Sequence, residues 1–334
     1  MTKISVVFIC DSNFVIPTAV AITSMICNKN QDTHYAIYII AAELSEDEIE
    51  KLCKFRGRDI DICIIKASLK NFEGVRQFAH VTLAACLKFD LPNLIPDVDK
   101  ALYVDGDVII QKDLKDLFEI NINDYYAGAV QDIILIDNDF GVNNYFNSGV
   151  MLLNLKRLRA DDTSSALLEI RKSKIKSTLM DQDCFNVLFD KKVKLLPVKY
   201  NCFYNYFVRR RNNYTLDSIN KCFETNYATL DEMKADSFIL HFIDFDKPWI
   251  YFNSALTSEW DEYFKKSPFR MYNLKRKSIK LRHFIASHHA TNLLYWFFKY
   301  WHDHDFKFAL NQARYYFADK KMTFKKDDKE PERI

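Results

Sequence analysis

Glycine is scarce in this sequence, with 6 residues among 334. The chain contains neither GxGxxG nor GxxxxGKT, the glycine-rich motifs that hold phosphates in Rossmann and P-loop proteins. The sequence therefore argues against nucleotide binding by either of these loops. Any phosphate group that the protein binds must be held by groups other than a glycine-rich loop.

The sequence also lacks a CxxC pair, a secretory signal and a long apolar run. Its 8 cysteines stand singly inside apolar segments, which is typical of buried thiols in a reducing compartment. The apolar segment at residues 3–10 is too short for a signal-peptide core or a membrane span, and no segment reaches the roughly 18 apolar residues that spanning requires. We therefore expect a cytoplasmic protein without a transmembrane helix.

Charge is distributed unevenly along a chain of ordinary composition. Hydrophobic residues make up 49% and charged residues 28% of the sequence, proportions that are usual for a globular protein. Residues 268–334 contain 15 Lys and Arg against 7 Asp and Glu, whereas the rest of the chain is net acidic. We expect an α/β domain over residues 1–265, a helical, basic and aromatic region at 266–318, and a flexible tail at 319–334.

Strands and helices are expected to alternate through the first hundred residues. Four strands are predicted by apolar, β-branched runs, at residues 4–10, 34–42, 59–67 and 101–110. A helical pattern follows the first run, and Ser45 with Glu48 forms a capping box before the second helix. This alternation favours a doubly wound parallel sheet, in which ligands bind beyond the carboxyl ends of the strands.

Acidic side chains follow two of these strands. Asp11 and Asn13 come after the first strand, and Asp105, Gly106 and Asp107 form a DxD motif with the fourth. Two carboxylates separated by one glycine can face the same side of a turn, where they repel each other unless a cation lies between them. Divalent cations prefer oxygen ligands and can grip a diphosphate. A plain surface turn is the alternative interpretation.

His241 ends a later predicted strand, and Lys247 follows it closely. An imidazole together with two carboxylates suits a Mn²⁺ site, and a lysine offers a cation to a phosphate. Taken alone, a histidine at the end of a strand more often makes a hydrogen bond in the core. The combination of His241 with Asp105 and Asp107 is therefore more specific than any one of these residues.

Two further polar segments adjoin predicted core elements. Asn147, with Ser148 and Gly149, lies against an apolar strand, and Asp181 and Gln182 open a helix. A turn into the core explains the first segment. Acidic residues that complement the helix dipole explain the second. Neither segment indicates a function by itself.

Five ordered segments resemble those of family 8 glycosyltransferases, of the bacterial kind that adds hexoses to the lipopolysaccharide core. They are "FICDSNF", "KALYVDGDVII", "YFNSGVMLLNL", "DQDCFNVLF" and "HFIDFDKPW", and they extend over about residues 3–250. The resemblance implies a GT-A fold, a mixed sheet of Rossmann-like type that binds a nucleotide sugar. It also implies a UDP-hexose donor, a Mn²⁺ cofactor that Mg²⁺ can replace, and transfer with retention of anomeric configuration.

The resemblance assigns the metal and the diphosphate to particular residues. Asp105, Asp107 and His241 would bind the metal. Asp105 and Gly106 would also belong to the donor-binding turn, and Lys247 would meet the diphosphate. These roles agree with the chemistry of the side chains, because a diphosphate leaving group needs its negative charge neutralised.

Further roles follow for the uridine and the transferred sugar. By the resemblance, Asp11 and Asn13 would contact the uracil and the ribose. Asn147 and Asp181 would contact the donor sugar, and Gln182 would lie near its anomeric carbon. Asp181 and Gln182 are therefore the expected catalytic residues.

The chain departs from the family pattern at two places. The family usually shows Tyr-x-Arg before the DxD segment, and here Ala84 and Cys86 occupy those positions, without the arginine that helps to hold the donor. Asp244 replaces the glycine of His-x-x-Gly-x-x-Lys-Pro-Trp and adds a negative charge near the expected diphosphate. Both changes bear on donor affinity and donor identity.

The region 266–318 places Trp296 and Trp301 close to clusters of Lys and Arg. This composition suits a helix at a membrane interface, where anionic lipid attracts each basic residue by about 1 kcal/mol. The alternative is a pair of helices packed on the catalytic domain with a solvated basic face. The resemblance favours peripheral binding to the anionic inner face of the membrane. No nucleic-acid partner is expected, because no DNA- or RNA-binding module accompanies these charges.

The sequence thus predicts a Mn²⁺-dependent, retaining hexosyltransferase. It would transfer glucose or galactose from a UDP-sugar to a lipid-linked saccharide, the lipopolysaccharide or lipooligosaccharide core. One alternative keeps the fold and changes the acceptor to a protein or a capsule chain. Another is a non-catalytic scaffold that binds a sugar nucleotide or a glycan.

Overall fold

The computed structural model describes residues 2–69, 83–133, 142, 144–173, 181–207, 215–243, 246–254 and 256–278. The chain divides into two compact units, Met1–Arg276 and Lys277–Ile334. The first unit contains almost all of the described residues. Asp244, the predicted tail at 319–334 and most of the predicted region at 266–318 lie outside the described residues.

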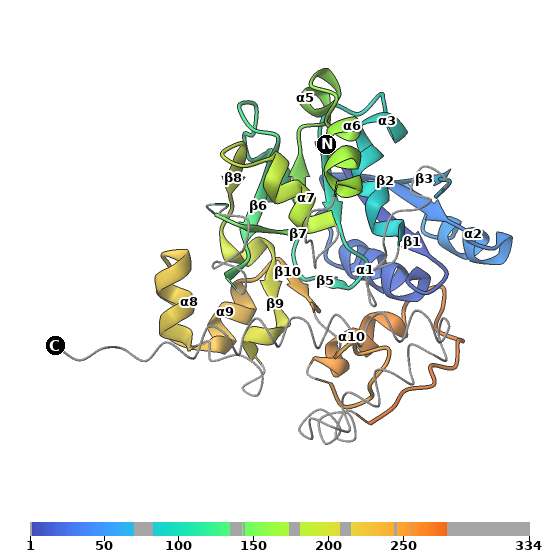
Figure 1. The fold of residues 1–334 in the computed structure, drawn as a ribbon. Helices are drawn as coiled ribbons and strands as arrows, with labels where there is room; N and C mark the ends of the chain where they lie inside the picture. Colours follow the sequence, from blue (N-terminus) through green and yellow to red (C-terminus); the bar gives the residue numbers. More distant parts are fainter. Residues whose placement is uncertain are drawn as a thin grey trace, which may run out of the picture. The chain divides into compact units, whose positions relative to one another are not determined.

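Seven strands of the described chain form a mixed sheet in the order β3-β2-β1-β4-β7-β6-β8 (Figure 1). Their bounds are β1 Thr2–Asp11, β2 Thr33–Ala42, β3 Ile60–Lys66, β4 Ala101–Val104, β6 Ala127–Gln131, β7 Phe146–Leu153 and β8 Val193–Leu195. The strands β3, β2, β1 and β4 are parallel, which confirms the prediction for the first hundred residues. β7 runs antiparallel to both β4 and β6, so the second half of the sheet is mixed.

A second, smaller sheet has the order β5-β10-β9. Its strands are β5 Val108–Ile110, β9 Cys202–Phe203 and β10 Ile239–His241. The sequence predicts one strand over residues 101–110, and this prediction is wrong. The chain leaves the large sheet at Val104 and enters the small sheet at Val108, where β5 pairs antiparallel with β10. The turn at residues 105–107 therefore connects the two sheets.

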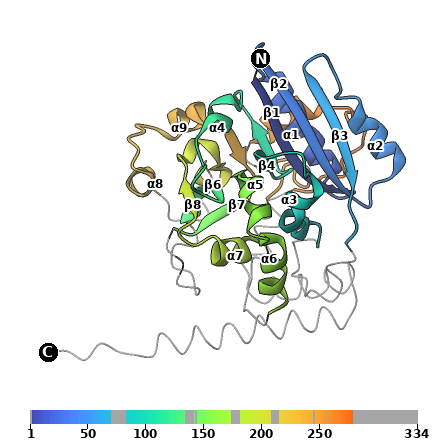
Figure 2. The same cartoon turned by 90° about the horizontal axis from the view of Figure 1, so that it is seen from above.

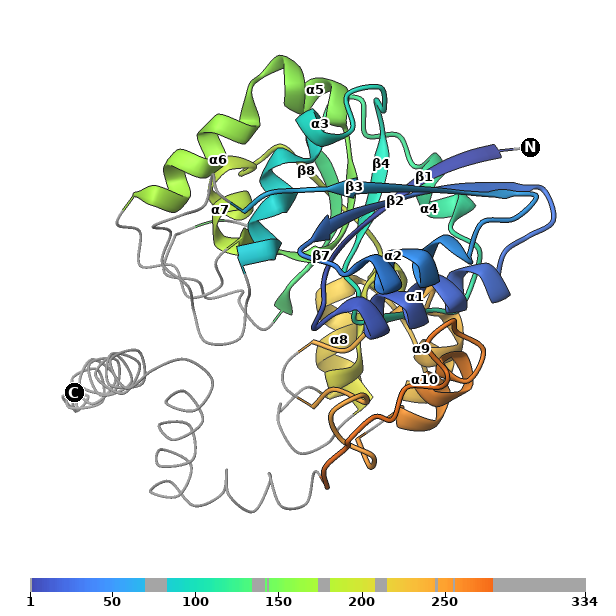
Figure 3. The ribbon, with the colours of Figure 1, turned by 90° about the vertical axis from the view of Figure 1, so that its right-hand side faces the viewer.

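Helices cover both faces of the large sheet (Figure 3). One face carries α1 Val15–Cys27 and α2 Glu46–Cys53. The other carries η2 Leu83–Asp90, α3 Leu91–Leu94, α5 Leu155–Ala160, α6 Thr163–Lys172 and α7 Asp181–Leu188 (Figure 2). Since successive side chains of a strand point to opposite faces, Val6 and Phe8 pack with α1 whereas Val7 and Ile9 pack with the second group.

The described part also contains the α-helices α4 Lys115–Glu119, α8 Leu216–Phe223, α9 Leu230–Asp236 and α10 Thr257–Phe264, and the 3₁₀ helices η4 Val198–Tyr200 and η5 Tyr204–Phe207. The predicted capping box of α2 is present. The Ser45 hydroxyl accepts a hydrogen bond from the backbone N–H of Glu48, and the Glu48 carboxylate accepts one from the backbone N–H of Ser45 at 2.8 Å. A local sequence signal therefore fixes where this helix begins.

The first unit extends past residue 265, the predicted end of the catalytic domain. Phe269 is completely buried in the core that contains α1, and Arg276 forms an ion pair with Asp261 of α10. Residues up to Arg276 are thus held by the first unit. Within the described residues, no helix is long and apolar enough to cross a membrane.

Candidate active site

Strand pairing brings two aspartates and a histidine together at the junction of the two sheets. Asp105 follows β4, and its backbone N–H donates to the carbonyl oxygen of Gly149 in β7 at 2.7 Å. Asp107 precedes β5, whose pairing with β10 places His241 opposite Val108. One ligand atom from each of Asp105, Asp107 and His241 lies within 4.8 Å of the other two. The structure thus groups the three predicted metal ligands.

Asp107 is buried and has two cationic or ionisable partners. Its Oδ2 lies 2.5 Å from Lys247 Nζ, and its Oδ1 lies 3.2 Å from His241 Nε2. Burial acts to raise the pKa of Asp107, but Lys247 and His241 outweigh burial and hold this pKa well below its usual range. Asp107 is therefore ionised at neutral pH, as a metal ligand must be.

Asp105 has a different set of partners. Its Oδ1 lies 3.2 Å from Lys88 Nζ and accepts a hydrogen bond from the Tyr103 hydroxyl at 2.5 Å. Burial raises the pKa of Asp105, although Lys88 opposes this effect. Lys88 Nζ is also 2.7 Å from Asp181 Oδ2, and the lysine side chain is only 5% exposed. One buried ammonium group therefore joins Asp105 to Asp181.

Lys88 is a site residue that the sequence interpretation missed. Ala84 and Cys86 suggest that a donor-binding cation is absent before the DxD segment. Both residues are buried, and Lys88, two residues beyond Cys86, places a cation in the site from the same 3₁₀ helix. The available signal was a single lysine within the apolar run "LAACLKF". Because an unpaired buried ammonium is costly, such a lysine indicates carboxylate partners elsewhere in the chain.

The side-chain amide of Gln182 is held at both ends. Its Oε1 accepts hydrogen bonds from the backbone N–H of Ser148 at 3.1 Å and from Asn147 Nδ2 at 3.0 Å. Its Nε2 donates to Asp132 Oδ2 at 3.1 Å. Asn147 Oδ1 in turn accepts the backbone N–H of Gly149 at 3.0 Å. Backbone donors of β7 therefore set the orientation of both amides, and the structure brings Asn147 and Gln182 together.

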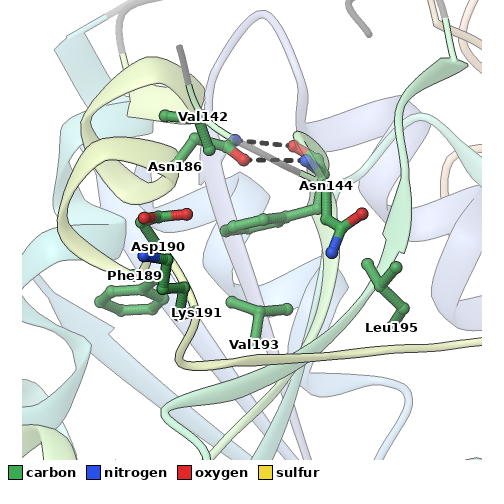
Figure 4. A pocket seen from close by; sticks show the side chains of 9 residues that line it. Val142, Asn144, Asn186, Phe189, Asp190, Lys191, Val193 and Leu195 are labelled. Atoms are coloured by element: carbon green, nitrogen blue, oxygen red, sulfur yellow. Dashed lines mark hydrogen bonds between the residues drawn. The ribbon is translucent and has the colours of Figure 1, made fainter. Parts of the chain in front are cut away.

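Asn186 fastens α7 to β7. Its Nδ2 donates to the carbonyl oxygen of Phe146, and its Oδ1 accepts the backbone N–H of Phe146, both at 2.8 Å (Figure 4). This pair of hydrogen bonds holds α7, whose first turn contains Asp181 and Gln182, beside β7. The pocket in Figure 4 lies around this contact and contains no predicted donor or metal residue. It is lined by Val142, Asn144, Phe146, Asn186, Phe189, Asp190, Lys191, Val193 and Leu195.

The loop after β1 meets the segment that contains Lys247. The Asp11 carboxylate accepts hydrogen bonds from the backbone N–H groups of Asn13 at 2.9 Å and Phe14 at 3.0 Å, which shapes the turn. Phe14 contacts Trp249 edge to face, with ring centroids 6.0 Å apart, and Lys247 Nζ lies 5.7 Å from the Trp249 ring centre. The contact of Asp11 and Asn13 with a nucleoside stays a prediction.

Two glycines allow the backbone to pack tightly around the site. A Cβ atom at Gly106 would lie 2.3 Å from Thr18 Oγ1 of α1. A Cβ atom at Gly149 would lie 2.3 Å from His241 Cε1 and 2.7 Å from Asp105 Oδ2. Side chains at these positions would collide with their neighbours, so glycine is required for the observed geometry.

The three grouped side chains fit a divalent cation. Carboxylate oxygens suit both Mg²⁺ and Mn²⁺, and the added imidazole nitrogen favours Mn²⁺. His241 Nε2 and Asp105 Oδ2 are 3.9 Å apart, a separation that one cation can bridge with two bonds of about 2.1 Å. The donor set and its spacing therefore make a metal centre chemically reasonable at this position.

Comparison with known proteins identifies relatives that transfer sugars. Glycosyltransferase GlyE of Streptococcus pneumoniae serotype 4 is 26% identical over 267 residues, which cover 78% of this chain and 61% of GlyE. This chain thus spans about three fifths of the length of GlyE. A lipopolysaccharide 1,2-glucosyltransferase of Escherichia coli is 26% identical over 295 residues, which cover 82% of this chain and 81% of the relative.

The fold matches that of a solved sugar transferase. The galactosyltransferase LgtC, in complex with donor and acceptor sugar analogs, superposes with a TM-score of 0.68 at 23% identity, over 79% of this chain and 96% of LgtC. The predicted GT-A fold is confirmed. The model of glycosyl transferase family 8 matches residues 5–252, which include every site residue described above. On this evidence, the chain belongs to glycosyl transferase family 8.

Proposed function

We propose that this protein is a Mn²⁺-dependent, retaining hexosyltransferase that moves glucose or galactose from a UDP-sugar to a lipopolysaccharide or lipooligosaccharide core. The grouping of Asp105, Asp107 and His241 beside Lys247 carries the proposal. The glucosyltransferase and galactosyltransferase names of its relatives support a hexose donor and a lipopolysaccharide acceptor. Family members typically use a divalent metal, which supplies charge neutralisation for a diphosphate leaving group.

In this proposal the residues around the metal position the donor. Lys247 pairs with Asp107 and is close enough to the metal ligands to meet the diphosphate. Asp11 and Asn13, on the neighbouring loop, contact the uracil and the ribose. Lys88 neutralises part of the negative charge that the aspartates bring into the site. The side chains thus counter the repulsion between the acidic residues and the phosphates.

Retention of configuration is proposed to occur by attack on the face that the leaving group departs from. A double displacement needs a carboxylate nucleophile. Gln182 is an amide whose two ends are both hydrogen-bonded, and Asp181 is paired with Lys88. We infer that Gln182 steadies the oxocarbenium-like state and that the leaving phosphate oxygen accepts the proton of the acceptor hydroxyl. An active-site mutant of LgtC exchanges a glutamine for a glutamate, so that relative also has an active-site glutamine.

This mechanism predicts the behaviour of the Gln182→Ala variant. Transfer should slow by about 10²- to 10³-fold because the variant loses electrostatic stabilisation of the transition state. It should not be abolished, because Gln182 is not the nucleophile in this mechanism. Single-turnover measurements with UDP-hexose test this. A sugar covalently trapped on a side chain of the unaltered protein, together with complete loss of transfer in Gln182→Ala, would contradict front-face attack.

Donor use is tested by calorimetry and by release of UDP. UDP should bind in the presence of Mn²⁺ and weakly after chelation, and UDP-glucose or UDP-galactose should be consumed when a truncated lipopolysaccharide core is added. An Asp105→Asn, Asp107→Asn double variant serves as the inactive control. Binding without turnover on saccharide, protein or capsule acceptors would instead favour a non-catalytic scaffold.

The lipid-linked acceptor implies a membrane surface near the protein, which we propose to be the anionic inner leaflet bound by basic residues after Arg276. Phe269 and Arg276 belong to the first unit, so a truncation for this test should end after residue 278 and leave them in place. The full chain should sediment with vesicles that contain anionic lipid, and the truncated chain should not. Equal sedimentation of both chains would overturn the membrane proposal.

A further inference from the structure

Asn201 lies between the metal ligands and the residues proposed to hold the donor sugar. It directly precedes β9, and its side chain is completely buried. Its Oδ1 lies 2.9 Å from His241 Nδ1, and its Nδ2 donates to Asn147 Oδ1 at 2.9 Å. One amide therefore connects the histidine of the metal site with the asparagine that binds Gln182.

The orientation of this amide follows from backbone donors that cannot be reversed. The N–H of Gly149 donates to Asn147, so the Asn147 atom at this contact is the oxygen. Asn201 must then present its nitrogen to Asn147 and its oxygen to His241. Because an amide oxygen only accepts hydrogen bonds, the proton on this side of the imidazole belongs to Nδ1. His241 Nε2 is the nitrogen that faces Asp105 and Asp107.

We propose that Asn201 is a positioning residue that fixes the Nδ1–H form of His241 and couples it to the Asn147–Gln182 pair. This inference rests on the proposed metal site. It assigns Asn201 the role of a partner that orients a metal-ligating imidazole through its second nitrogen. It also makes the geometry of the metal ligand depend on the same hydrogen-bond chain that orients Gln182.

The first test measures the imidazole without metal, donor or turnover. In full-length protein labelled with ¹⁵N-histidine, His241 Nδ1 should carry a proton, with the signal assigned by its loss in His241→Gln. In Asn201→Leu, Nδ1 has lost its acceptor while Asp107 still faces Nε2 at 3.2 Å, so Nδ1 should lose its proton. In Asn201→Asp, it should stay on Nδ1, because a carboxylate also accepts. An unchanged Nδ1 proton in folded Asn201→Leu would overturn the proposal.

The second test measures Mn²⁺ binding by electron paramagnetic resonance of the free ion. The dissociation constant should rise about 10- to 100-fold in Asn201→Leu and stay within about threefold in Asn201→Asp. An equal rise in both variants would overturn the proposal, because it would show a general packing effect. Both measurements are made without donor or acceptor, so failure of the proposed sugar transfer is detected separately.

A matched control separates positioning from stability. Asn28 is a partly buried amide outside the site, and its side-chain nitrogen donates to the carbonyl oxygens of Ser24 and Ile110 and to the Tyr263 hydroxyl. Asn28→Leu should lower stability and leave the His241 proton and Mn²⁺ binding unchanged. If Asn201→Leu does not fold, Asn201→Asp provides the test: loss of the Nδ1 proton in this variant would contradict the assigned role.

Discussion

The parallel half of the large sheet and the junction of the two sheets are built from different interactions. In β1, β2 and β3, buried apolar side chains on both faces provide the core, and the ion pair between Lys3 and Asp61 is exposed to solvent. At the junction, Lys88 joins Asp105 to Asp181, and Lys247 pairs with Asp107. The parallel half needs only buried apolar side chains, which many different sequences can supply. The junction needs particular charged side chains from distant segments of the chain, so single substitutions at the junction should lower stability more.

The largest loss of stability is expected when the buried ammonium is removed. Lys88→Met keeps much of the side-chain volume and leaves Asp105 and Asp181 without a shared cation, so the free energy of unfolding should fall by about 3–5 kcal/mol. Urea denaturation measures this. The control Lys66→Met removes an exposed partner of Glu46 in the parallel half and should change stability by less than about 0.5 kcal/mol. Similar losses of unfolding free energy in Lys88→Met and Lys66→Met would contradict the proposed difference between the junction and the parallel half.

Gly149→Ala should break the metal site directly. The added methyl carbon would lie only 2.3 Å from His241 Cε1 and 2.7 Å from Asp105 Oδ2, so two of the three ligands must move. We expect Mn²⁺ affinity to fall by about 100-fold, the upper end of the effect of misplacing ligands. Gly128→Ala is the control, since its methyl group would meet only apolar atoms of Leu196 and Ile122 at 3.2 Å or more. Unchanged Mn²⁺ binding in Gly149→Ala would contradict the tight packing described above.

A smaller effect is expected where α1 of the parallel half touches the junction. Gly106→Ala would bring a methyl group within 2.3 Å of Thr18 Oγ1, and the strain should cost about 1–3 kcal/mol of unfolding free energy. The Thr18→Ala, Gly106→Ala double variant should recover part of this loss, because the hydroxyl is gone while the Thr18 backbone stays at 3.3 Å. Thermal denaturation of the two single variants and the double variant gives the coupling free energy between positions 18 and 106. Simple additivity of the two substitutions would show that the contact is not the cause.

The smallest effect is expected at the cap of α2, in the parallel half of the sheet. Ser45→Ala removes the hydroxyl that accepts the N–H of Glu48 and should lower the unfolding free energy by about 1 kcal/mol. Mn²⁺ binding should stay unchanged. Altered metal affinity in this variant would mean that the two regions are energetically coupled.

The parallel half could be predicted from the sequence because its signals are local. Alternating or continuous apolar runs predict β1 to β3, and the capping box predicts the start of α2. The run at residues 101–110 contains a turn signal, Asp105-Gly106, but nothing local shows that its two parts belong to different sheets, because both parts are apolar. Its division depends on β7 and β10, which lie far along the chain and pair with different parts of the run.

The site was predictable only where residue types combine into a recognisable set. Asp105, Asp107 and His241 are such a set, and the structure groups them. Lys88 and Asn201 are single residues without a motif, and their roles arise from contacts with Asp181 and His241. The role of Lys88 could have been inferred from the cost of burying an unpaired lysine. The role of Asn201 can be inferred only from the directions of its hydrogen bonds in the structure.

The turn between the sheets also has a consequence for the order in which the chain folds during synthesis. β5 leaves the ribosome early, but its partner β10 is made more than a hundred residues later, followed by Lys247. Until then, Asp107 has neither His241 nor Lys247 beside it. Closing such a long loop is slow, so the parallel sheet can form first as a platform. A nascent chain that ends before residue 239 should therefore contain a folded core and no complete metal site.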